Sequence, residues 1–327
     1  MKYSLLDIAL VAEGEQPGAA LHGAVPLARA AARSGYHRVW YAEHHNMPRI
    51  ASAATSVLIA HVAANTEGIR LGAGGVMLPN HSPLLIAEQF GTLAALHPDR
   101  IDLGLGRAPG SDQNTMLALR RGPESADAFP RDVLELQGYL SGRTRIPGVR
   151  ATPGDGSNVP LYILGSSLFG AQLAAALGLP YAFASHFAPA ALHAAVRTYR
   201  SEFRPSEGQP EPYLIVAAGL AAAPTPEEAA EQHRAALRGR ARMFLARGAT
   251  LTDEDVDALL DTPAGSQIRD MMRYTAVGTP EQVHAYLADL AEQTGADELM
   301  LAPAAPARAD RLRAVELVTA PTTVSAS

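Results

Sequence analysis

Short apolar runs alternate with longer amphipathic segments along almost the whole chain. Runs rich in β-branched and aromatic residues predict eight strands, at residues 3–11, 36–42, 69–78, 100–106, 160–164, 181–185, 213–220 and 298–302. Between and after them, helical spacing predicts helices at 18–34, 51–64, 83–96, 127–140, 167–177, 189–203, 226–246, 280–292 and 308–317. Runs that are apolar throughout are typical of parallel strands buried on both faces. The alternation therefore predicts an α/β fold, and eight strands favour a closed (β/α)8 TIM barrel over an open doubly wound sheet.

One helical stretch does not fit this alternation. Residues 252–274 repeat the helical spacing directly after the helix at 226–246. We expect residues 1–327 to form a single domain with an inserted helical segment at about 226–276. The proline- and glycine-rich stretch 143–158 is expected to be a long loop, because the strands on either side continue one pattern.

Composition narrows the functional classes. The chain has 327 residues, of which 47% are hydrophobic, which is enough for one large domain. Its net charge of −6 argues weakly against nucleic-acid binding, which usually selects basic surfaces. The absence of cysteine excludes disulfides, zinc-thiolate sites and a cysteine nucleophile. No stretch approaches the roughly 20 apolar residues of a membrane helix. We expect a soluble cytoplasmic protein with no nucleic-acid or membrane partner.

Five strands are followed by unusual polar or glycine-rich peptides. These peptides are 43–46, 72–81, 104–111, 165–167 and 185–187. In a TIM barrel the loops after the strands meet at the carboxyl rim, where the active site lies. The pattern therefore predicts a single site at this rim.

The first of these peptides, Glu43-His44-His45-Asn46, contains adjacent histidines. Neighbouring residues on an extended segment face opposite ways, so at most one of them easily points into the barrel mouth. A histidine there can act as a general acid or base near neutral pH. A metal-binding role and a structural role are alternatives; because no second cluster with metal-ligand spacing is found, we expect no metal.

The other peptides also have two readings each. The glycines up to Gly74 and Gly75 allow either close approach of a ligand or a bulge at the rim. Arg107 could meet an anion or form a surface ion pair. Gly165, Ser166 and Ser167 precede an alanine-rich helix, so they could bind phosphate at its N-terminus or only cap it. His186 and Phe187 could line a pocket or pack in the interior.

Several stretches, taken in order, carry a family resemblance. They are 40–46, 71–83, 100–107, 163–176, 178–184 and 277–283. Together they resemble the bacterial-luciferase-like flavin monooxygenases, with the closest likeness to the single-chain branch that carries Ala-Glu-His-His-Asn and Gly-Ser-Ser. The resemblance extends from residue 6 to about residue 303. One departure is Gly106, which stands where luciferase itself has a cysteine.

The resemblance implies a TIM barrel that binds reduced FMN. It implies that His44 assists chemistry beside the flavin and that Gly74-Gly75 forms a non-prolyl cis peptide beneath the ring. It places Arg107 and one of Ser166 and Ser167 near the flavin phosphate. Arg131 is expected to be a second phosphate arginine, and Gly165 a further cofactor-binding residue. The rim residues His45, His81, His186 and Phe187 are expected to form a substrate pocket.

The implied activity is that of an FMNH2-dependent monooxygenase in a two-component system. A separate flavin reductase would supply FMNH2, and O2 would react through a flavin C4a-peroxide to oxygenate a small organic substrate, for example in tailoring a natural product. An F420-dependent dehydrogenase or reductase of the same superfamily is one alternative. A non-catalytic flavin-binding protein is another. Family dimers suggest a homodimer.

Overall fold

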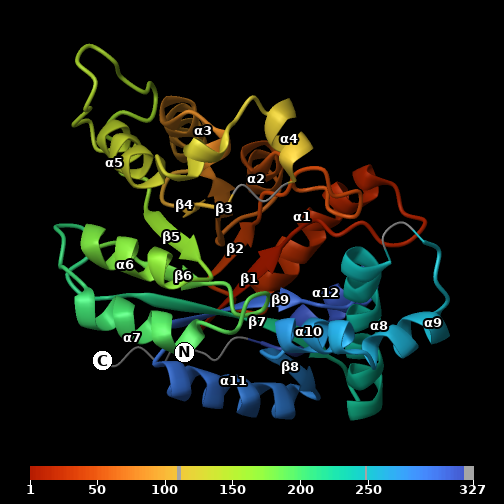
Figure 1. Ribbon diagram of the computed structural model, residues 1–327. Helices are drawn as coiled ribbons and strands as arrows, with labels where there is room; N and C mark the ends of the chain where they lie inside the picture. The colour runs from red at the N-terminus through yellow and green to blue at the C-terminus, as the bar shows by residue number, and fades with distance from the viewer. Residues whose placement is uncertain (109–111, 247–248, 320–327) are drawn as a thin grey trace.

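A closed parallel barrel forms the centre of the computed structural model, which describes residues 1–108, 112–246 and 249–319 (Figure 1). Its eight strands follow the order β1-β2-β3-β4-β5-β6-β7-β9, and β9 pairs with β1 to close the ring. They are β1 (Lys2–Asp7), β2 (Arg38–Tyr41), β3 (Arg70–Met77), β4 (Ile101–Gly106), β5 (Leu161–Gly165), β6 (Tyr181–Phe183), β7 (Leu214–Ala222) and β9 (Glu298–Pro303). The predicted TIM barrel is confirmed.

Helices surround the strands and cover their outer faces (Figure 1). In chain order they are α1 (Pro17–Arg33), α2 (Thr55–Ala63), α3 (Pro83–Leu96), α4 (Gln113–Ala118), α5 (Phe129–Leu140), α6 (Leu168–Leu177), α7 (Leu192–Glu202), α8 (Pro226–Leu245), α9 (Asp253–Leu260), α10 (Pro263–Met271), α11 (Pro280–Thr294) and α12 (Arg308–Leu317), with 3-10 turns at Leu78–Asn80 and Pro123–Ala126. The main apolar core lies between the two layers and includes Leu5, Phe90, Val133 and Leu299. Among the described residues, no helix is both long and apolar enough to cross a membrane.

A ninth strand was not predicted. β8 (Thr275–Gly278) pairs with the second half of β7, where Thr275 is opposite Gly219, whereas β6 pairs with the first half of β7. The strand lies outside the closed ring. Four residues are too few to show a two-residue period, and the stretch follows a helix directly, so the sequence gives little signal for it.

The first strand is shorter than predicted. It was expected to run to residue 11 but ends at Asp7. The next two residues turn the chain: Ala9 has a φ of 46°, and its N–H donates to the Asp7 carboxylate at 2.8 Å. The apolar residues Ile8 and Leu10 therefore leave the sheet and face the barrel mouth.

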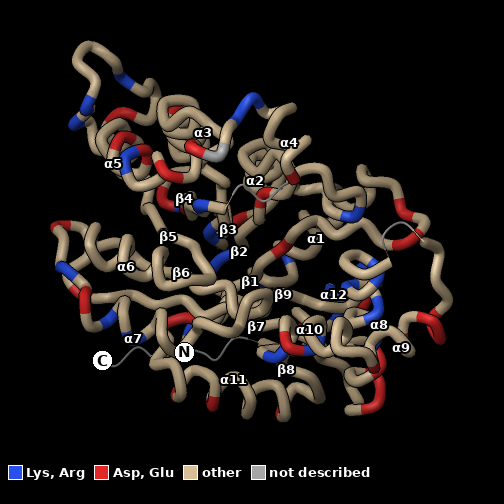
Figure 2. The backbone as a smooth tube through the Cα atoms, in the orientation of Figure 1, with Lys and Arg blue, Asp and Glu red and all other residues tan. Residues whose placement is uncertain are grey.

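The inserted segment is helical as predicted. α8, α9 and α10 share a small apolar cluster around Ala241, Val256 and Ile268. Arg238 on α8 forms ion pairs with Asp253 and Asp257 of α9, where Figure 2 shows basic residues beside acidic ones. The helices end at Met271, and residues 275 and 276, expected in the insert, belong to β8 instead.

Charged groups fill the amino end of the barrel. Arg38, the first residue of β2, lies between Asp102 and Glu298, with N···O distances of 2.7 and 3.0 Å. It also donates to the Tyr162 hydroxyl at 2.6 Å, and Arg70 pairs with the other oxygen of Asp102. All of these groups except Arg70 are buried. Above this layer, towards the other rim, the interior is filled by Leu6, Trp40, Tyr162, Ile215 and Met300.

Candidate active site

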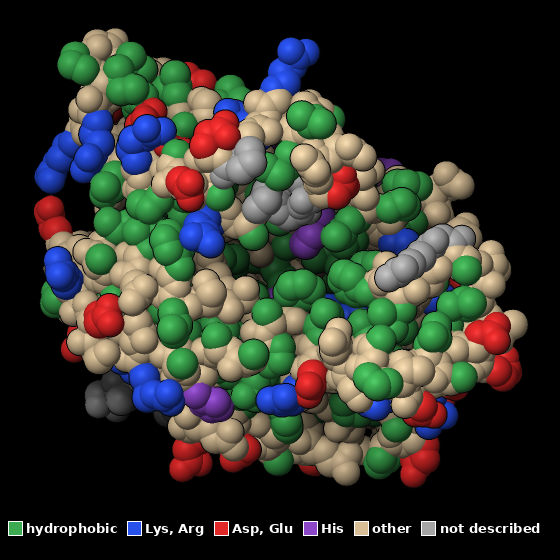
Figure 3. All heavy atoms as spheres, in the orientation of Figure 1, with side chains coloured by type: hydrophobic (Ala, Val, Ile, Leu, Met, Phe, Trp, Pro, Cys, Tyr) green, Lys and Arg blue, Asp and Glu red, His purple; other side chains and the backbone are tan. Residues whose placement is uncertain are grey.

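A cavity of about 790 Å³ opens at the carboxyl ends of the strands. Figure 3 shows a hollow in the middle of this face, lined mainly by hydrophobic side chains and with a histidine at its edge. The structure brings most of the predicted site residues to this cavity: His44, Gly74, Gly75, Arg107, Gly165, Ser166, Ser167, His186 and Phe187. A volume of this size suits a cofactor together with a small substrate.

One wall of the cavity is backbone without side chains. The peptide bond between Gly74 and Gly75 on β3 is cis, as the resemblance implied. A Cβ atom on Gly75 would lie 2.7 Å from the Gly104 carbonyl oxygen, and one on Gly74 would lie 2.8 Å from the Trp40 Cβ. Both contacts are too short for a real Cβ, so only glycine fits at these positions. The glycines leave a flat surface to which a planar ring can approach closely.

The second part of the cavity can bind an anion. The Arg107 guanidinium stacks on the Phe169 ring, with its carbon 4.1 Å from the ring centroid. Arg107 makes no ion pair with any residue in the described part of the chain, which disfavours the surface ion-pair reading. Beside it, Ser167 is the N-cap of α6, yet its side chain accepts no capping hydrogen bond. The hydroxyl and the first N–H groups of α6 are thus available to a phosphate.

Two histidines lie in the cavity as neutral bases. Burial lowers the pKa of His44 below its ordinary value of 6.5, and the positive charge of Arg240 lowers it further. Burial also lowers the pKa of His186, to about 3. Both imidazoles are therefore uncharged at neutral pH. A pKa of about 3 makes His186 a very weak base, so His44 is the better proton acceptor for a bound ligand.

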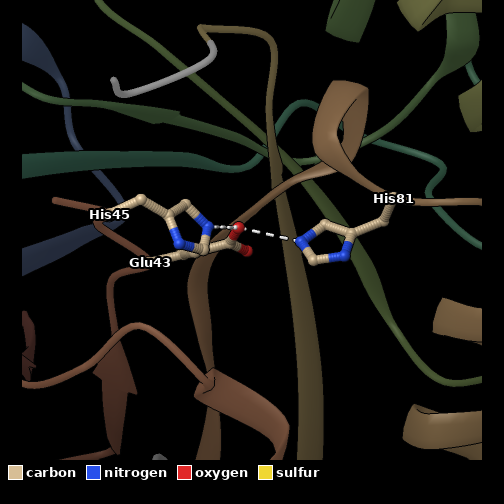
Figure 4. A group of neighbouring side chains, drawn as sticks. All are labelled: Glu43, His45 and His81. Atoms are coloured by element: carbon tan, nitrogen blue, oxygen red, sulfur yellow. Dashed lines mark hydrogen bonds and ion pairs between the residues drawn. The ribbon is translucent and has the colours of Figure 1, made fainter. Parts of the chain in front are cut away.

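His45 and His81 do not line the cavity, although they were expected in the substrate pocket. Both rings bond instead to one oxygen of Glu43, with N···O distances of 2.7 and 2.8 Å (Figure 4). The other oxygen of Glu43 accepts the Met77 N–H at 3.0 Å. The two adjacent histidines face opposite ways, as the sequence argument required: His44 lines the cavity, whereas His45 turns to Glu43.

The Glu43 group ties together the loops after β2 and β3. Burial alone would raise the pKa of Glu43, but hydrogen bonds from His81, His45 and the Met77 backbone outweigh it and lower the pKa below its usual value. The ligand atoms of Glu43, His45 and His81 lie within 4.8 Å of one another, which is close enough to hold a metal ion. Because both carboxylate oxygens already accept hydrogen bonds, the absence of a resident metal remains our prediction.

Arg131 also lies outside the cavity. It opens α5, its side chain is 77% exposed, and its nearest acidic group is the neighbouring Asp132 at 3.4 Å. The helix directs this guanidinium to solvent, so the structure does not place it with the other residues that were predicted to bind the phosphate.

Besides Arg107, three arginines line the cavity, and sequence reasoning found none of them: Arg49 follows β2, and two more come from helices. Arg240 comes from α8 of the inserted segment, and Arg311 from α12. Arg311 donates to the carbonyl oxygens of Leu10 and Ala305 and so holds the rim together. Neither Arg240 nor Arg311 lies near a glycine-rich or histidine motif, and a helix pattern gives no sign of which arginine turns inward.

The sequence profile of one family, luciferase-like monooxygenase, matches residues 1–298. The chain belongs to this family. It is accordingly a flavin-dependent monooxygenase, with the glycine surface, cationic end and histidines described above at the carboxyl rim of its barrel.

Individual relatives agree with this assignment. A luciferase-like monooxygenase of Escherichia coli K12 is 48% identical over 304 residues, which cover 91% of this chain and 90% of the relative. The N-acetyl-S-alkylcysteine monooxygenase of Bacillus subtilis is 41% identical over 196 residues, covering 56% of this chain and 57% of that enzyme. The crystal structure of apo-MsnO8 has a TM-score of 0.88 at 37% identity and covers 97% of both chains.

Proposed function

We propose that this luciferase-like monooxygenase binds reduced FMN and uses O2 to oxygenate a small organic substrate, as the oxygenase of a two-component system. The observation that carries the proposal is that one cavity contains both a glycine surface at Gly74-Gly75 and the cation Arg107, which forms no ion pair within the described part of the chain. A ligand that combines a planar ring with a terminal phosphate fits both.

The residues present fit FMN part by part. Gly74 and Gly75 would support the isoalloxazine ring, since any side chain there would clash with strand backbone or Trp40. Arg107, Ser166 and Ser167 would hold the phosphate, because a guanidinium and open helix N–H groups both favour a doubly charged anion. When bound, reduced FMN supplies the activation of O2.

The protein's own contribution is to position ligands, exclude water and move a proton. Apolar side chains such as Leu6, Met47 and Phe129 line the cavity and keep water from a reactive flavin. His44 is neutral near pH 7, so one of its ring nitrogens can accept a proton from the substrate and return it later. The Glu43 hydrogen bonds fix the loop that carries His44.

The partners of the reaction remain predictions. We expect a separate flavin reductase to deliver FMNH2, and a homodimeric assembly. The main alternative within the superfamily is hydride transfer with F420, a deazaflavin, which would not involve O2.

A direct test compares cofactors and follows the oxygen atom. FMN is expected to bind to the purified protein more tightly than F420 in a fluorescence titration. With photoreduced FMN, ¹⁸O2 and a thioether such as N-acetyl-S-methylcysteine, mass spectrometry is expected to show one ¹⁸O atom in the product. Tighter binding of F420, with hydride transfer in the absence of O2, would establish the alternative.

Arg107→Met tests the cofactor orientation. Removing one charged hydrogen-bond donor to phosphate is expected to weaken FMN binding by about 10- to 100-fold, since such a bond contributes about 1.5–3 kcal/mol. Arg131→Met is the matched control, because its side chain is exposed and lies outside the cavity. Equal FMN affinities in the two variants would place the phosphate elsewhere.

A further inference from the structure

Arg240 is a cation in the cavity that has no anionic partner among the residues that the structure describes. It projects from α8, and its guanidinium lies 5.8 Å from the centroid of the Phe187 ring. Its Nη1 donates a hydrogen bond to the Met271 Sδ at 3.6 Å, and thioether sulfur is a weak acceptor. In residues 1–108, 112–246 and 249–319 it forms no ion pair.

The neighbouring arginines on α8 show that this is specific to Arg240. Arg238 pairs with Asp253 and Asp257, and Arg242 pairs with Asp253. These pairs connect α8 to α9 and account for both charges structurally. No such structural account exists for Arg240, whose side chain turns the other way, towards the barrel.

An unpaired guanidinium in an apolar cavity is costly. Arginine carries five N–H donors and stays charged, and here burial even lowers its pKa. Desolvating a charge without a counter-ion is unfavourable, whereas a carboxylate can satisfy two of the donors at once. The site is therefore ready for an anion that the protein itself does not provide.

The location ties this anion to the catalytic end of the cavity. Arg240, His44 and His186 line the same cavity, and the charge of Arg240 lowers the pKa of both histidines. The Nδ1 atom of His186 is buried and has no hydrogen-bond partner among the described residues. Arg107, in contrast, stacks on a different ring, Phe169, beside the serines proposed to hold the flavin phosphate.

We propose that Arg240 forms an anion subsite that binds a carboxylate group of the organic substrate and holds the substrate beside His44. This inference rests on the proposed function, since it assumes that FMN occupies the glycine surface. It assigns the substrate to anionic organic molecules. It also gives the inserted segment a role, because α8 brings the recognising residue to the barrel mouth.

Matched pairs of small ligands test the subsite. Benzoate and hexanoate are titrated against benzamide and hexanamide by calorimetry, with the FMN-loaded protein and again with the flavin-free protein. We expect the wild type to bind each carboxylate at least about 10-fold more tightly than its amide. Arg240→Met should lose this preference while keeping its amide affinities, and Arg240→Lys should keep part of it.

Two controls separate this proposal from the cofactor assignment. Arg234→Gln changes an arginine on the same helix that is exposed and paired with Glu231, so it should behave as wild type. FMN affinity should be unchanged in Arg240→Met. A loss of FMN affinity in Arg240→Met, like that expected for Arg107→Met, would mean that Arg240 binds the flavin instead. The subsite proposal would be wrong if Arg240→Met kept the carboxylate preference, or if the wild type showed no such preference. If the wild type fails to bind FMN, the proposed function fails, but the flavin-free titrations still decide the subsite.

Discussion

Replacing His44 with alanine is expected to lower kcat by about 10²- to 10⁴-fold, the usual contribution of a general acid or base. FMN affinity should change little, because the cofactor contacts proposed above come from the glycine surface, Arg107 and the serines. The His44 ring is half-buried and neutral, and it lines the cavity. Its loss therefore removes a proton acceptor without removing a residue of the barrel core. Turnover and the FMN dissociation constant, measured on the same preparation, separate the two effects.

The pH profile gives a second readout of this residue. Because burial lowers the pKa of His44, its neutral form should persist below pH 6.5, and kcat/KM should fall only when the pH drops through the lowered pKa. That acid limb should disappear in His44→Ala. His193→Ala serves as control, because His193 is an exposed residue of α7 whose ring contacts Tyr274 and does not line the cavity. Retention of wild-type turnover in His44→Ala would remove this histidine from the mechanism, and no turnover in either protein would favour a binding protein.

Replacing Arg38 with methionine is expected to reduce the free energy of unfolding by about 3–5 kcal/mol. Arg38 is buried between Asp102 and Glu298 at the amino end of the barrel, and it bonds to both carboxylates. Methionine would fill similar space but leave Glu298 without its cation and Asp102 with Arg70 alone. Two carboxylates near one another would then be under-compensated in a buried site. Urea denaturation of wild type and variant measures the loss.

An exposed ion pair supplies the comparison for Arg38. Arg33→Met removes the pair between Arg33 and Glu316, whose side chains are 65% and 48% exposed, and should cost less than about 1 kcal/mol. The urea midpoint should fall in Arg38→Met with an unchanged slope, which indicates a loss of stability without a change in the unfolded state. Similar midpoints for the two variants would mean that the buried network contributes no more than a surface pair.

Local patterns were sufficient to predict the barrel. At least half of the residues in each strand from β1 to β7, and in β9, are apolar or glycine, and such runs followed by helical spacing have few solutions other than a parallel sheet closed into a barrel. The structure differs from the prediction where a strand is too short to show a sequence pattern, or where a side chain changes the course of the backbone. β8 has four residues, and β1 ends early because the Asp7 side chain captures the Ala9 N–H.

The candidate site was predicted unevenly for the same reason. Glycines and serines next to strand ends are typical of positions where backbone approaches a ligand, and the structure places Gly74, Gly75, Ser166 and Ser167 at the cavity. His45 and His81 were placed in the substrate pocket because they are histidines at the rim. The structure places them on Glu43, since a buried carboxylate binds any donors within reach.

The sequence by itself determined the fold class, the rim that carries the site and the family, because these follow from periodicity and from motifs that are contiguous in the chain. Only the tertiary structure decided which side chains face the cavity. Arg131 and Arg240 are both arginines on amphipathic helices, yet one points to solvent and the other to the barrel mouth. That difference depends on how each helix packs on the barrel, through contacts between residues far apart in the sequence.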